Sequence, residues 1–593
     1  MSLEVLLAEK VSEVIEELYN QKVDLNVIQI QKTLPQFEGD LTCVVFPFLR
    51  FSKKDPVTTG NEIGAVLVDQ MKEFTGFNVV KGFLNLEMNS ANWGETLVTI
   101  SKNENYGVLK PIIKKTIMVE YSSPNTNKPL HLGHIRNNFL GYSVAKILEA
   151  NGHKVLKTQI INDRGIHICK SMLSWQKYAN GGTPESEGLK GDHLVGKYYV
   201  EFDKHYKAEM KVLMDEKGLS KEDAMQQAPS FIEAQVMLRK WEEGDEEVLK
   251  LWSMMNQWVY DGFESTYKEM GVDFDKMYYE SNTYLLGKQV VDEGLKKGVF
   301  YKREDGSVWC DLTPEGLDEK LVLRKDGTAV YMTQDIGTAI ERDKDFKING
   351  MIYTVGNEQE YHFKVLFLIL KKLGYDFYEG LYHLSYGMVE LPSGKMKTRE
   401  GTVVDADILM HEMIETATRA AEEKGKLDGY SASEIKEINR KIGMSALKYF
   451  LLKVDPRKGM IFNPEESIDF NGNTGPFILF NAVRIKSLIR KYGLDDYQGT
   501  VINSISEKEK ALISKLNDYE KVISLAGKEF SPAVIANYVY DLAKEYSQFY
   551  ASHYILNEEN EDLKKFRLFL SQEVGKVIEK GMALLGVEIP ERM

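Results

Sequence analysis

The chain has 593 residues, of which 43% are hydrophobic and 28% are charged, values that are typical of globular proteins and exclude a disordered or fibrous chain. A length of this size predicts several domains rather than one large core. The formal net charge of −14 excludes a uniformly basic surface, so any contact with nucleic acid must use local basic patches.

The sequence predicts a cytoplasmic protein without a membrane segment. No apolar run reaches the ~18–20 residues that a membrane span needs, and the first twenty residues carry acids throughout, unlike a signal peptide. Cys43, Cys169 and Cys310 are far apart, and none belongs to a CxxC pair. We therefore expect neither a disulfide framework nor a protein-bound metal.

An amphipathic helix is expected to open the chain, because Leu3, Leu7 and Val11 begin a run of apolar residues spaced three or four apart. The segments FEGDLTCVVFPFLRF and FNVVKGFLNLEM follow, and their β-branched and aromatic residues with Gly and Pro predict strands and turns. We infer a small α+β domain over residues 1–110.

From Thr116 onward the pattern predicts alternating strands and helices. The run TIMVEYS is a buried strand, a helix runs from about Ile135 to Asn151-Gly152, and KVLKTQIIN is the next strand. After a charged and mostly helical insertion near 170–285, the alternation resumes with the strand MIYTVG and the helix NEQEYHFKVLFLILKKLG.

The expected fold class is therefore α/β. A Rossmann-type, doubly wound parallel sheet forms the catalytic core over 111–444, and an all-α domain covers 445–593. Sheets of this kind bind ligands at the carboxyl ends of their strands.

The segment PNTNKPLHLGH lies between the first strand of this core and its helix. A turn at this point directs backbone N–H groups and the helix dipole toward an anion, and His131 and His134 can donate to the same phosphate group. Gly133 allows a close approach. The segment contains neither a P-loop nor a GxGxxG motif. An H-x-x-H pair can also begin a helix or bind a metal, so this motif alone leaves its role open.

HLGH resembles the HIGH motif of class I aminoacyl-tRNA synthetases, and PNTNKPLHLGH resembles its arginyl version. The segment ELPSGKMKTREG is similar to the KMSKS loop of the same family, but Lys397 replaces the serine and Thr398 replaces the second lysine. The resemblance implies that Lys128 supplies the missing cation. It implies four catalytic residues: Lys128, His131, His134 and Lys395.

The resemblance also implies a nucleotide pocket. Gly356, His362, Met388 and Val389 stand where related enzymes line the adenine and ribose site. The ATP-binding residues that we expect are Pro124, Asn125, His131, Gly133, His134, Gly356, His362, Met388, Val389, Lys395 and Met396.

A pocket for arginine should combine carboxylates with neutral acceptors, because a guanidinium is planar, permanently charged and carries five donors. Tyr331 and Asp335 lie four residues apart and share a face if they are helical. The resemblance assigns them to the guanidinium, and it assigns Asn125 and Gln359 to the amino-acid body, with Glu120 between the two ends.

Contacts with transfer RNA are expected at both ends of the chain. NTGPFILFNAVRIKSLIRK resembles the start of the anticodon-binding domain of arginyl enzymes, and the N-terminal domain is similar to the one that touches the tRNA elbow. The basic residues expected to hold phosphates are Arg484, Lys486, Arg490 and Lys491. Aromatic side chains can stack on unpaired bases, but such stripes more often form the core, as we expect here for Tyr538, Tyr546, Phe549 and Tyr550.

Together these features predict an enzyme that activates L-arginine with ATP and Mg²⁺ and transfers it to tRNA(Arg), as a monomer without a tightly bound cofactor. The resemblance further implies that tRNA must be bound before arginine is activated. A glutamyl or cysteinyl synthetase is an alternative, although Asp335 does not suit the first and three scattered cysteines do not suit the second. An RNA-binding relative that has lost catalysis is another.

Overall fold

The computed structural model describes residues 3–34, 36–392, 404–424, 429–493 and 505–593. They form two compact units. The first consists of Met1–Tyr106, Leu488–Asp518 and Glu545–Val574, and the second of Gly107–Ser487, Tyr519–Lys544 and Gly575–Met593. The division into three domains at 110 and 444 stays a prediction. No helix among the described residues combines the length and apolarity needed to cross a bilayer.

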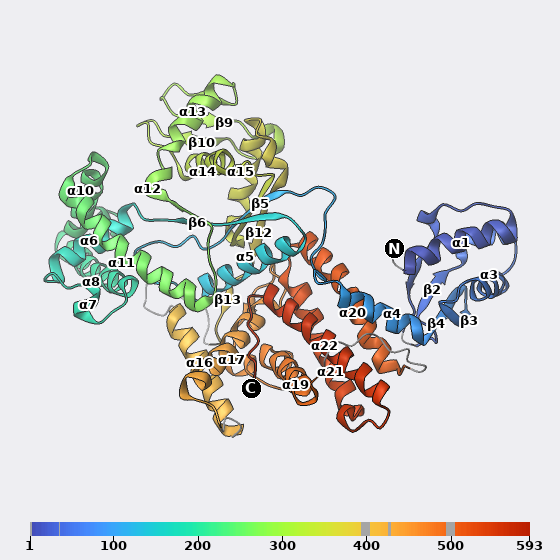
Figure 1. The fold of residues 1–593 in the computed structure, drawn as a ribbon. Coiled ribbons are helices and arrows are strands. Elements are labelled where there is room, and N and C mark those ends of the chain that lie inside the picture. The colour runs from blue at the N-terminus through green and yellow to red at the C-terminus, as the bar shows by residue number, and fades with distance from the viewer. Residues whose placement is uncertain (1–2, 35, 393–403, 425–428, 494–504) are drawn as a thin grey trace. The chain divides into compact units, whose positions relative to one another are not determined.

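The N-terminal part of the first unit is an α+β fold, as predicted (Figure 1). Helix α1 (Leu3–Tyr19) buries Leu7, Val11 and Ile15 on one face. The strands form an antiparallel sheet in the order β1-β2-β4-β3, against which α3 (Pro56–Gln70) packs. The strands are β1 (Ile30–Lys32), β2 (Leu41–Val44), β3 (Phe74–Val80) and β4 (Phe83–Met88), and the other helices are α2 (Leu49–Ser52) and α4 (Ser90–Lys102).

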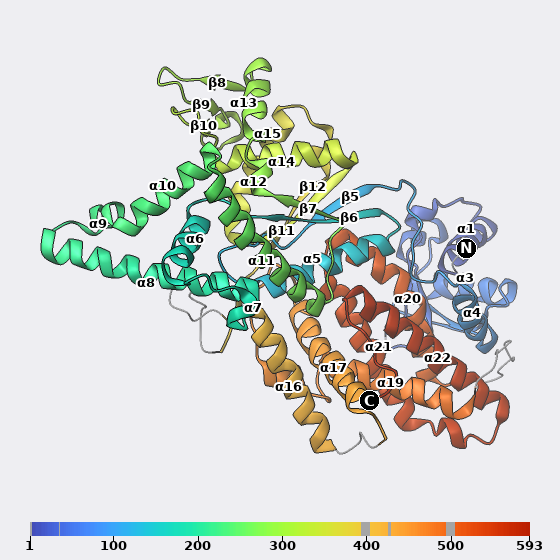
Figure 2. The same cartoon turned by 60° about the vertical axis from the view of Figure 1, so that its left-hand side comes forward.

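A five-stranded parallel sheet organises the second unit (Figure 2). The strand order is β12-β11-β5-β6-β7, so the chain starts in the middle, adds β6 and β7 on one side, and then returns to add β11 and β12 on the other. The strands are β5 (Thr116–Glu120), β6 (Lys154–Ile161), β7 (Lys276–Tyr279), β11 (Gly350–Gly356) and β12 (Leu381–Tyr386). The direction of winding reverses between β5 and β11, where ligands bind in sheets of this type.

Helices cover both faces of this sheet, which confirms the doubly wound class (Figure 2). Successive side chains of a strand point to opposite faces. Met118 of β5 belongs to the core shared with α14 (Tyr331–Phe346) and α15 (Glu360–Lys372). On the other face lies α5 (Leu132–Ala150). A Cβ on Gly141 of α5 would lie 2.4 Å from the Cβ of Tyr121, so the glycine allows this helix to approach the sheet closely.

The predicted insertion is helical up to Met270, but its expected end at 285 is wrong. Lys276–Tyr279 within that range forms β7, which pairs with β6 at the edge of the sheet. A small antiparallel sheet, absent from the sequence prediction, follows it in the order β10-β9-β8. These elements are α6 (Ile166–Tyr178), α7 (Pro184–Glu187), α8 (Gly191–Lys217), α9 (Lys221–Gln227), α10 (Pro229–Glu243), α11 (Glu246–Met270), α12 (Glu280–Thr283), α13 (Leu286–Lys296), β8 (Phe300–Lys302), β9 (Val308–Cys310) and β10 (Lys320–Leu323).

The C-terminal part is helical, as predicted, apart from the two-residue strand β14 (Met460–Ile461), which pairs with β13 (Val389–Glu390). Tyr546 and Phe549 are fully buried, which confirms the expectation that they belong to the core. The helices are α16 (Ala406–Lys424), α17 (Ala432–Leu452), α18 (Pro464–Ser467), α19 (Gly475–Tyr492), α20 (Glu507–Glu529), α21 (Pro532–Ser552) and α22 (Glu561–Leu584).

Candidate active site

Helix α5 begins at Leu132, three residues earlier than predicted, because His131 caps it. The His131 Nδ1 accepts the Gly133 N–H at 3.1 Å, and the His134 Nδ1 accepts the His131 N–H at 3.1 Å. Leu132 N–H donates to Val404 O at 3.1 Å. The expectation that backbone N–H groups here face an anion is therefore wrong for these three residues, whose N–H groups already have acceptors.

The capping arrangement fixes which ring nitrogen of each histidine can donate to a ligand. A neutral imidazole has one donor and one acceptor nitrogen. Since both Nδ1 atoms accept backbone N–H groups, the protons must lie on the two Nε2 atoms. The rings are 4.0 Å apart, so His131 and His134 present two N–H donors side by side.

Both histidines are neutral near neutral pH. Burial and then the charge of Lys128 lower the pKa of His131 to about 4, against an opposing effect of Asp405. Burial, followed by the neighbouring His131 and Lys128, holds the pKa of His134 well below its ordinary value. Donation from the Nε2 atoms therefore does not depend on protonating either ring.

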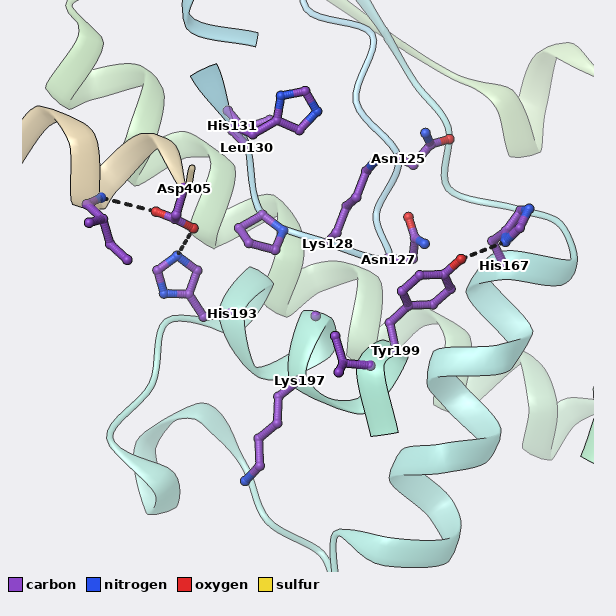
Figure 3. Close-up of a pocket in the computed structure, with 14 residues that line it drawn as sticks. Asn125, Asn127, Lys128, Leu130, His131, His167, His193, Lys197, Tyr199 and Asp405 are labelled. Carbon is purple, nitrogen blue, oxygen red and sulfur yellow. Dashed lines mark hydrogen bonds and ion pairs between the residues drawn. The ribbon is translucent and has the colours of Figure 1, made fainter. Parts of the chain in front are cut away.

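A cavity of about 580 Å³ opens beside this helix start, lined by the β5–α5 turn, α6, α8 and residues 405–408 (Figure 3). Lys128 points into it, and none of the described carboxylates lies within ion-pair distance of its ammonium group. Lys197 also lines the cavity but points away and pairs with Glu187. Asn125 is held at the end of β6, since it forms a parallel bridge with Asn162.

The backbone that follows the second signature segment lies against the first one. His131 and Asp405 form an antiparallel bridge, and Ala406 N–H donates to Leu130 O at 3.0 Å. Lys395 and Met396, like the rest of residues 393–403, lie outside the described residues. The first segment thus contacts the described residues that directly follow the second segment in the chain.

The expected arginine residues on α14 share one face of that helix and lie at the edge of the reversal point. Tyr331 is 70% exposed, and Asp335 is half-buried. The Asp335 Oδ2 lies 2.6 Å from the Nε2 of His362, a residue expected in the nucleotide pocket. Gln359 is exposed, three residues beyond the end of β11 at Gly356. None of Tyr331, Asp335 and Gln359 lines the cavity beside α5, and their common role in binding arginine stays a prediction.

Glu120 is occupied by another part of the chain. This carboxylate, 5% exposed, pairs with the guanidinium of Arg342, which is 1% exposed and comes from α14. Buried charges need a partner, and here the chain supplies both. The assignment of Glu120 to the substrate stays a prediction, but any substrate guanidinium would have to share this carboxylate with Arg342.

A buried arginine of α5 holds the backbone of Gly387 and Met388, directly before Val389, the other residue expected in the adenine pocket. Arg136 donates to Gly387 O at 2.7 Å and to Lys458 O at 2.9 Å, and it is 1% exposed. Arg136 thereby joins α5 to the backbone that precedes β13 and to the backbone that precedes β14. Val389 is buried, whereas Met388 is 49% exposed. Of the two residues, only the Met388 side chain is therefore accessible to a ligand.

Comparison with known sequences agrees with this geometry. A family model described as "tRNA synthetases class I (R), catalytic domain" matches residues 96–463, and one described as "DALR anticodon binding domain" matches residues 478–593. The arginine–tRNA ligase of Bacteroides thetaiotaomicron is 58% identical, covering 100% of both chains. That of Parabacteroides distasonis is 59% identical over 98% of each. The chain belongs to the arginyl-tRNA synthetase family.

Solved structures share the fold of this arginyl-tRNA synthetase family member. The arginyl-tRNA synthetase of Thermus thermophilus superimposes with a TM-score of 0.78 at 22% identity, and that of Plasmodium falciparum with a TM-score of 0.75 at 18% identity. Both comparisons cover 100% of each chain. At these identities the likeness concerns the fold alone.

In this arginyl-tRNA synthetase family member, the sequence analysis did not single out Glu280, an acid that interacts electrostatically with Asp335. Glu280 directly follows β7, and burial raises its pKa to about 7, with Asp335 and Asp163 adding to the rise and Arg164 opposing it. An acid at the carboxyl end of a parallel strand is a recognisable signal. It could not be used because β7 itself was not predicted.

The basic residues expected to bind tRNA all lie on α19, but they are not equally available. Lys486 is held by Glu591 at 2.6 Å and Glu579 at 3.2 Å, so it is a poorer phosphate ligand than expected. Arg484 stacks on the Phe480 ring at 4.6 Å. Arg490 and Lys491 are exposed in the last turn of the helix, where a cation is also favoured by the helix dipole.

Proposed function

We propose that the chain is an arginine–tRNA ligase that joins L-arginine to the 3′ end of tRNA(Arg), with ATP as the second substrate. In the first step a carboxylate oxygen of arginine attacks the α-phosphorus of ATP, and diphosphate leaves. In the second step a hydroxyl group of the terminal ribose attacks the carbonyl carbon of the adenylate, and AMP leaves. The observation that carries the proposal is the 56–59% identity, over nearly the whole chain, to proteins named arginine–tRNA ligase.

The phosphate site that we propose consists of His131, His134 and Lys128. Two neutral Nε2–H donors and one ammonium group can follow the negative charge as it develops on the α- and leaving phosphates, and Mg²⁺ enters with ATP as part of the substrate. Lys395 of the second signature segment completes this set. Support comes from the fixed tautomers of the histidines and from the cavity that Lys128 shares with His131.

The arginine site that we propose lies at the strand ends around α14. Asp335 and Glu280 face the guanidinium, and Asn125 and Gln359 hold the amino-acid body. Support comes from the electrostatic coupling between Glu280 and Asp335 and from the position of Glu280 directly after β7, since ligands bind at the carboxyl ends of parallel strands. Arginine would replace His362 as the partner of Asp335 or share it.

The RNA contacts that we propose are Arg484, Arg490 and Lys491 on α19, with the N-terminal domain at the tRNA elbow. That the protein acts in the cytoplasm is supported by three cysteines that are buried and unpaired. A monomeric state stays a prediction.

Pyrophosphate exchange into ATP, measured with each amino acid in turn in the presence of tRNA, tests the function. We expect exchange with arginine and not with glutamate or cysteine. Exchange with one of those two would support the corresponding synthetase instead. No exchange with any amino acid, combined with tight binding of tRNA, would support the RNA-binding alternative.

A further inference from the structure

A cluster of charged side chains joins the helical insertion to the residues that follow the second signature segment. The His193 Nε2, in the first turn of α8, lies 3.0 Å from the Asp405 Oδ2 and 3.4 Å from the Asp407 Oδ2 (Figure 3). Lys190, the residue before α8, pairs with Asp407 and lies 3.3 Å from Asp192. We call these five residues the 190–407 cluster.

The acids of this cluster also organise the start of α16. Asp405 accepts the N–H groups of Asp407 at 2.9 Å and Ile408 at 3.1 Å with one carboxylate oxygen, which leaves the other for His193. Asp407 accepts a further hydrogen bond from Thr266 of α11 at 2.9 Å. The stretch 404–407 is therefore held by two helices of the insertion on one side and by the backbone of residues 130–132 on the other.

The charges in the cluster are nearly balanced by the chain itself. Hydrogen bonds to Asp405 and Asp407 raise the pKa of His193 to about 10, so that this ring is cationic at neutral pH. Two cations then face three carboxylates. Asp192, His193 and Asp407 also have the spacing of metal ligands, but the ammonium group of Lys190 already lies between the two acids. The geometry thus favours an ion-pair cluster over a metal site.

A fixed position for residues 404–407 matters because they follow the second signature segment, which ends at residue 401, in the chain. Its other end follows β13, whose neighbouring carbonyls are held by the buried Arg136. Residue 404 is the first described residue after 393–403, and its backbone accepts a hydrogen bond from the helix that carries His131 and His134. A shift of 404–407 would move that attachment point relative to the phosphate site.

We propose that Lys190 and His193 are positioning residues for adenylate formation, because they hold residues 404–407, which follow the second signature segment, against the insertion and next to the start of α5. The proposal rests on the proposed function. It makes the insertion a part of the ATP site even though neither residue need touch ATP. It also predicts that the cation at position 193 is what matters rather than the imidazole ring.

The test compares His193→Asn with His193→Lys, which keeps a cation, and with the control His205→Asn. His205 lies on the same helix and pairs with Glu201 at 2.9 Å, outside the cavity. The measurements are the KM values for ATP and for arginine and the kcat of pyrophosphate exchange with tRNA present. We expect His193→Asn to reduce kcat/KM for ATP by about 10- to 100-fold, as small misplacements of catalytic groups do, while the KM for arginine stays unchanged. His193→Lys should recover most of the loss, and His205→Asn should match the wild type.

Several results would overturn the proposal. His193→Asn with wild-type kinetics would do so, and so would equal losses for ATP and arginine accompanied by a lower Tm, because these would indicate a role in stability only. A His193→Lys variant as weak as His193→Asn would show that charge is not the requirement. If His193→Asn does not fold, Lys190→Met provides a second test, because it should lower kcat/KM for ATP in the same selective way. A folded Lys190→Met variant with wild-type kinetics would also overturn the proposal. Absence of arginine-dependent exchange in the wild type would instead refute the proposed function, so the two failures are distinguishable.

Discussion

The two ring nitrogens of His131 and His134 have different roles: the Nδ1 atoms cap α5, and the Nε2 atoms are left to contact a ligand. Each Nδ1 accepts a backbone N–H at the start of α5, and each Nε2–H remains for an acceptor. In the proposed phosphate site this arrangement would be neutral and already in place before ATP arrives, so that little reorganisation is needed when charge develops. In the proposed mechanism the positive charge comes from the nearby Lys128.

The depressed pKa of His131 should make stability depend on pH. Between its ordinary pKa of 6.5 and its pKa of about 4 in the folded protein, the unfolded chain binds a proton that the folded chain does not. Stability should therefore be constant above this window and fall as the pH is lowered through it. Tm measured from pH 7 to pH 5 should fall more steeply for the wild type than for His131→Gln. Parallel curves would contradict a buried, neutral His131.

Lys128→Ala should slow adenylate formation selectively. Loss of one preorganised donor to the transition state typically lowers kcat by about 10²–10³, whereas the KM for arginine should change little. Single-turnover adenylate formation with tRNA present measures this. Adding Thr398→Lys should restore part of the rate if both positions serve the same phosphates. A Lys128→Ala enzyme as fast as the wild type would make the lysine an ordinary loop residue.

Asp335→Asn should weaken arginine binding, because it keeps the shape of the side chain but removes the charge opposite the guanidinium. Loss of one partner of a fully buried, charged hydrogen bond costs on the order of 2–5 kcal/mol, and because 44% of the Asp335 side chain is exposed we expect the lower end of this range. The readout is the KM for arginine, with the KM for ATP as an internal reference. Asp343→Asn, two turns further along the same helix, is the matched control. An unchanged KM for arginine would remove Asp335 from the pocket.

Sequence patterns identified the local motifs but not the partners that are distant in the chain. His131, His134 and Lys128 could be found because they lie within one turn between a strand and a helix. The pairing of His193 with Asp405, or of Glu120 with Arg342, joins residues more than two hundred positions apart and leaves no spacing pattern. Such pairs become visible only when the fold brings their elements together.

Among the elements, length and periodicity decided what could be predicted. Helix α5 and the strands β5, β6 and β11 have clear apolar patterns and were predicted, whereas β7 is only four residues long, KMYY, and follows a long helix. Short edge strands carry too few residues for a pattern to emerge. The missed β7 also concealed Glu280.

The close packing of α5 against the sheet at β5 can be tested by enlarging Gly141, which lies at that contact. In Gly141→Ala the new Cβ would meet the Cβ of Tyr121 at 2.4 Å, and overpacking of this kind costs about 1–3 kcal/mol. Gly94→Ala in α4 is the control, since no atom lies within 4 Å of its new Cβ, and a helical alanine there should stabilise by up to about 1 kcal/mol. Urea unfolding compares the two. Equal stability of both variants would contradict the tight α5–β5 contact.

For the enzyme as a whole, we expect that arginine activation needs bound tRNA, as the resemblance to arginyl enzymes implies. Each of α20, α21 and α22 runs through both compact units, so the unit that contains Arg490 and Lys491 is continuous in backbone with the unit that contains the active site. Binding energy from RNA can then be used to assemble the catalytic residues. Pyrophosphate exchange with and without tRNA measures this. Rapid arginine-dependent exchange without any RNA would disprove the requirement.

The first unit is assembled from segments that are far apart in the sequence, and this delays its folding during synthesis on the ribosome. The Tyr106 hydroxyl group donates to Leu516 O, 410 residues later, and Lys32 pairs with Asp518 in the same unit. At synthesis rates of about 5–20 residues per second, the N-terminal segment must wait roughly 20–80 s for these partners to be made. The first part of the chain to leave the ribosome is thus among the last to complete its tertiary contacts, and an early release from translation would leave it without Leu488–Asp518 and Glu545–Val574, the other two segments of its unit.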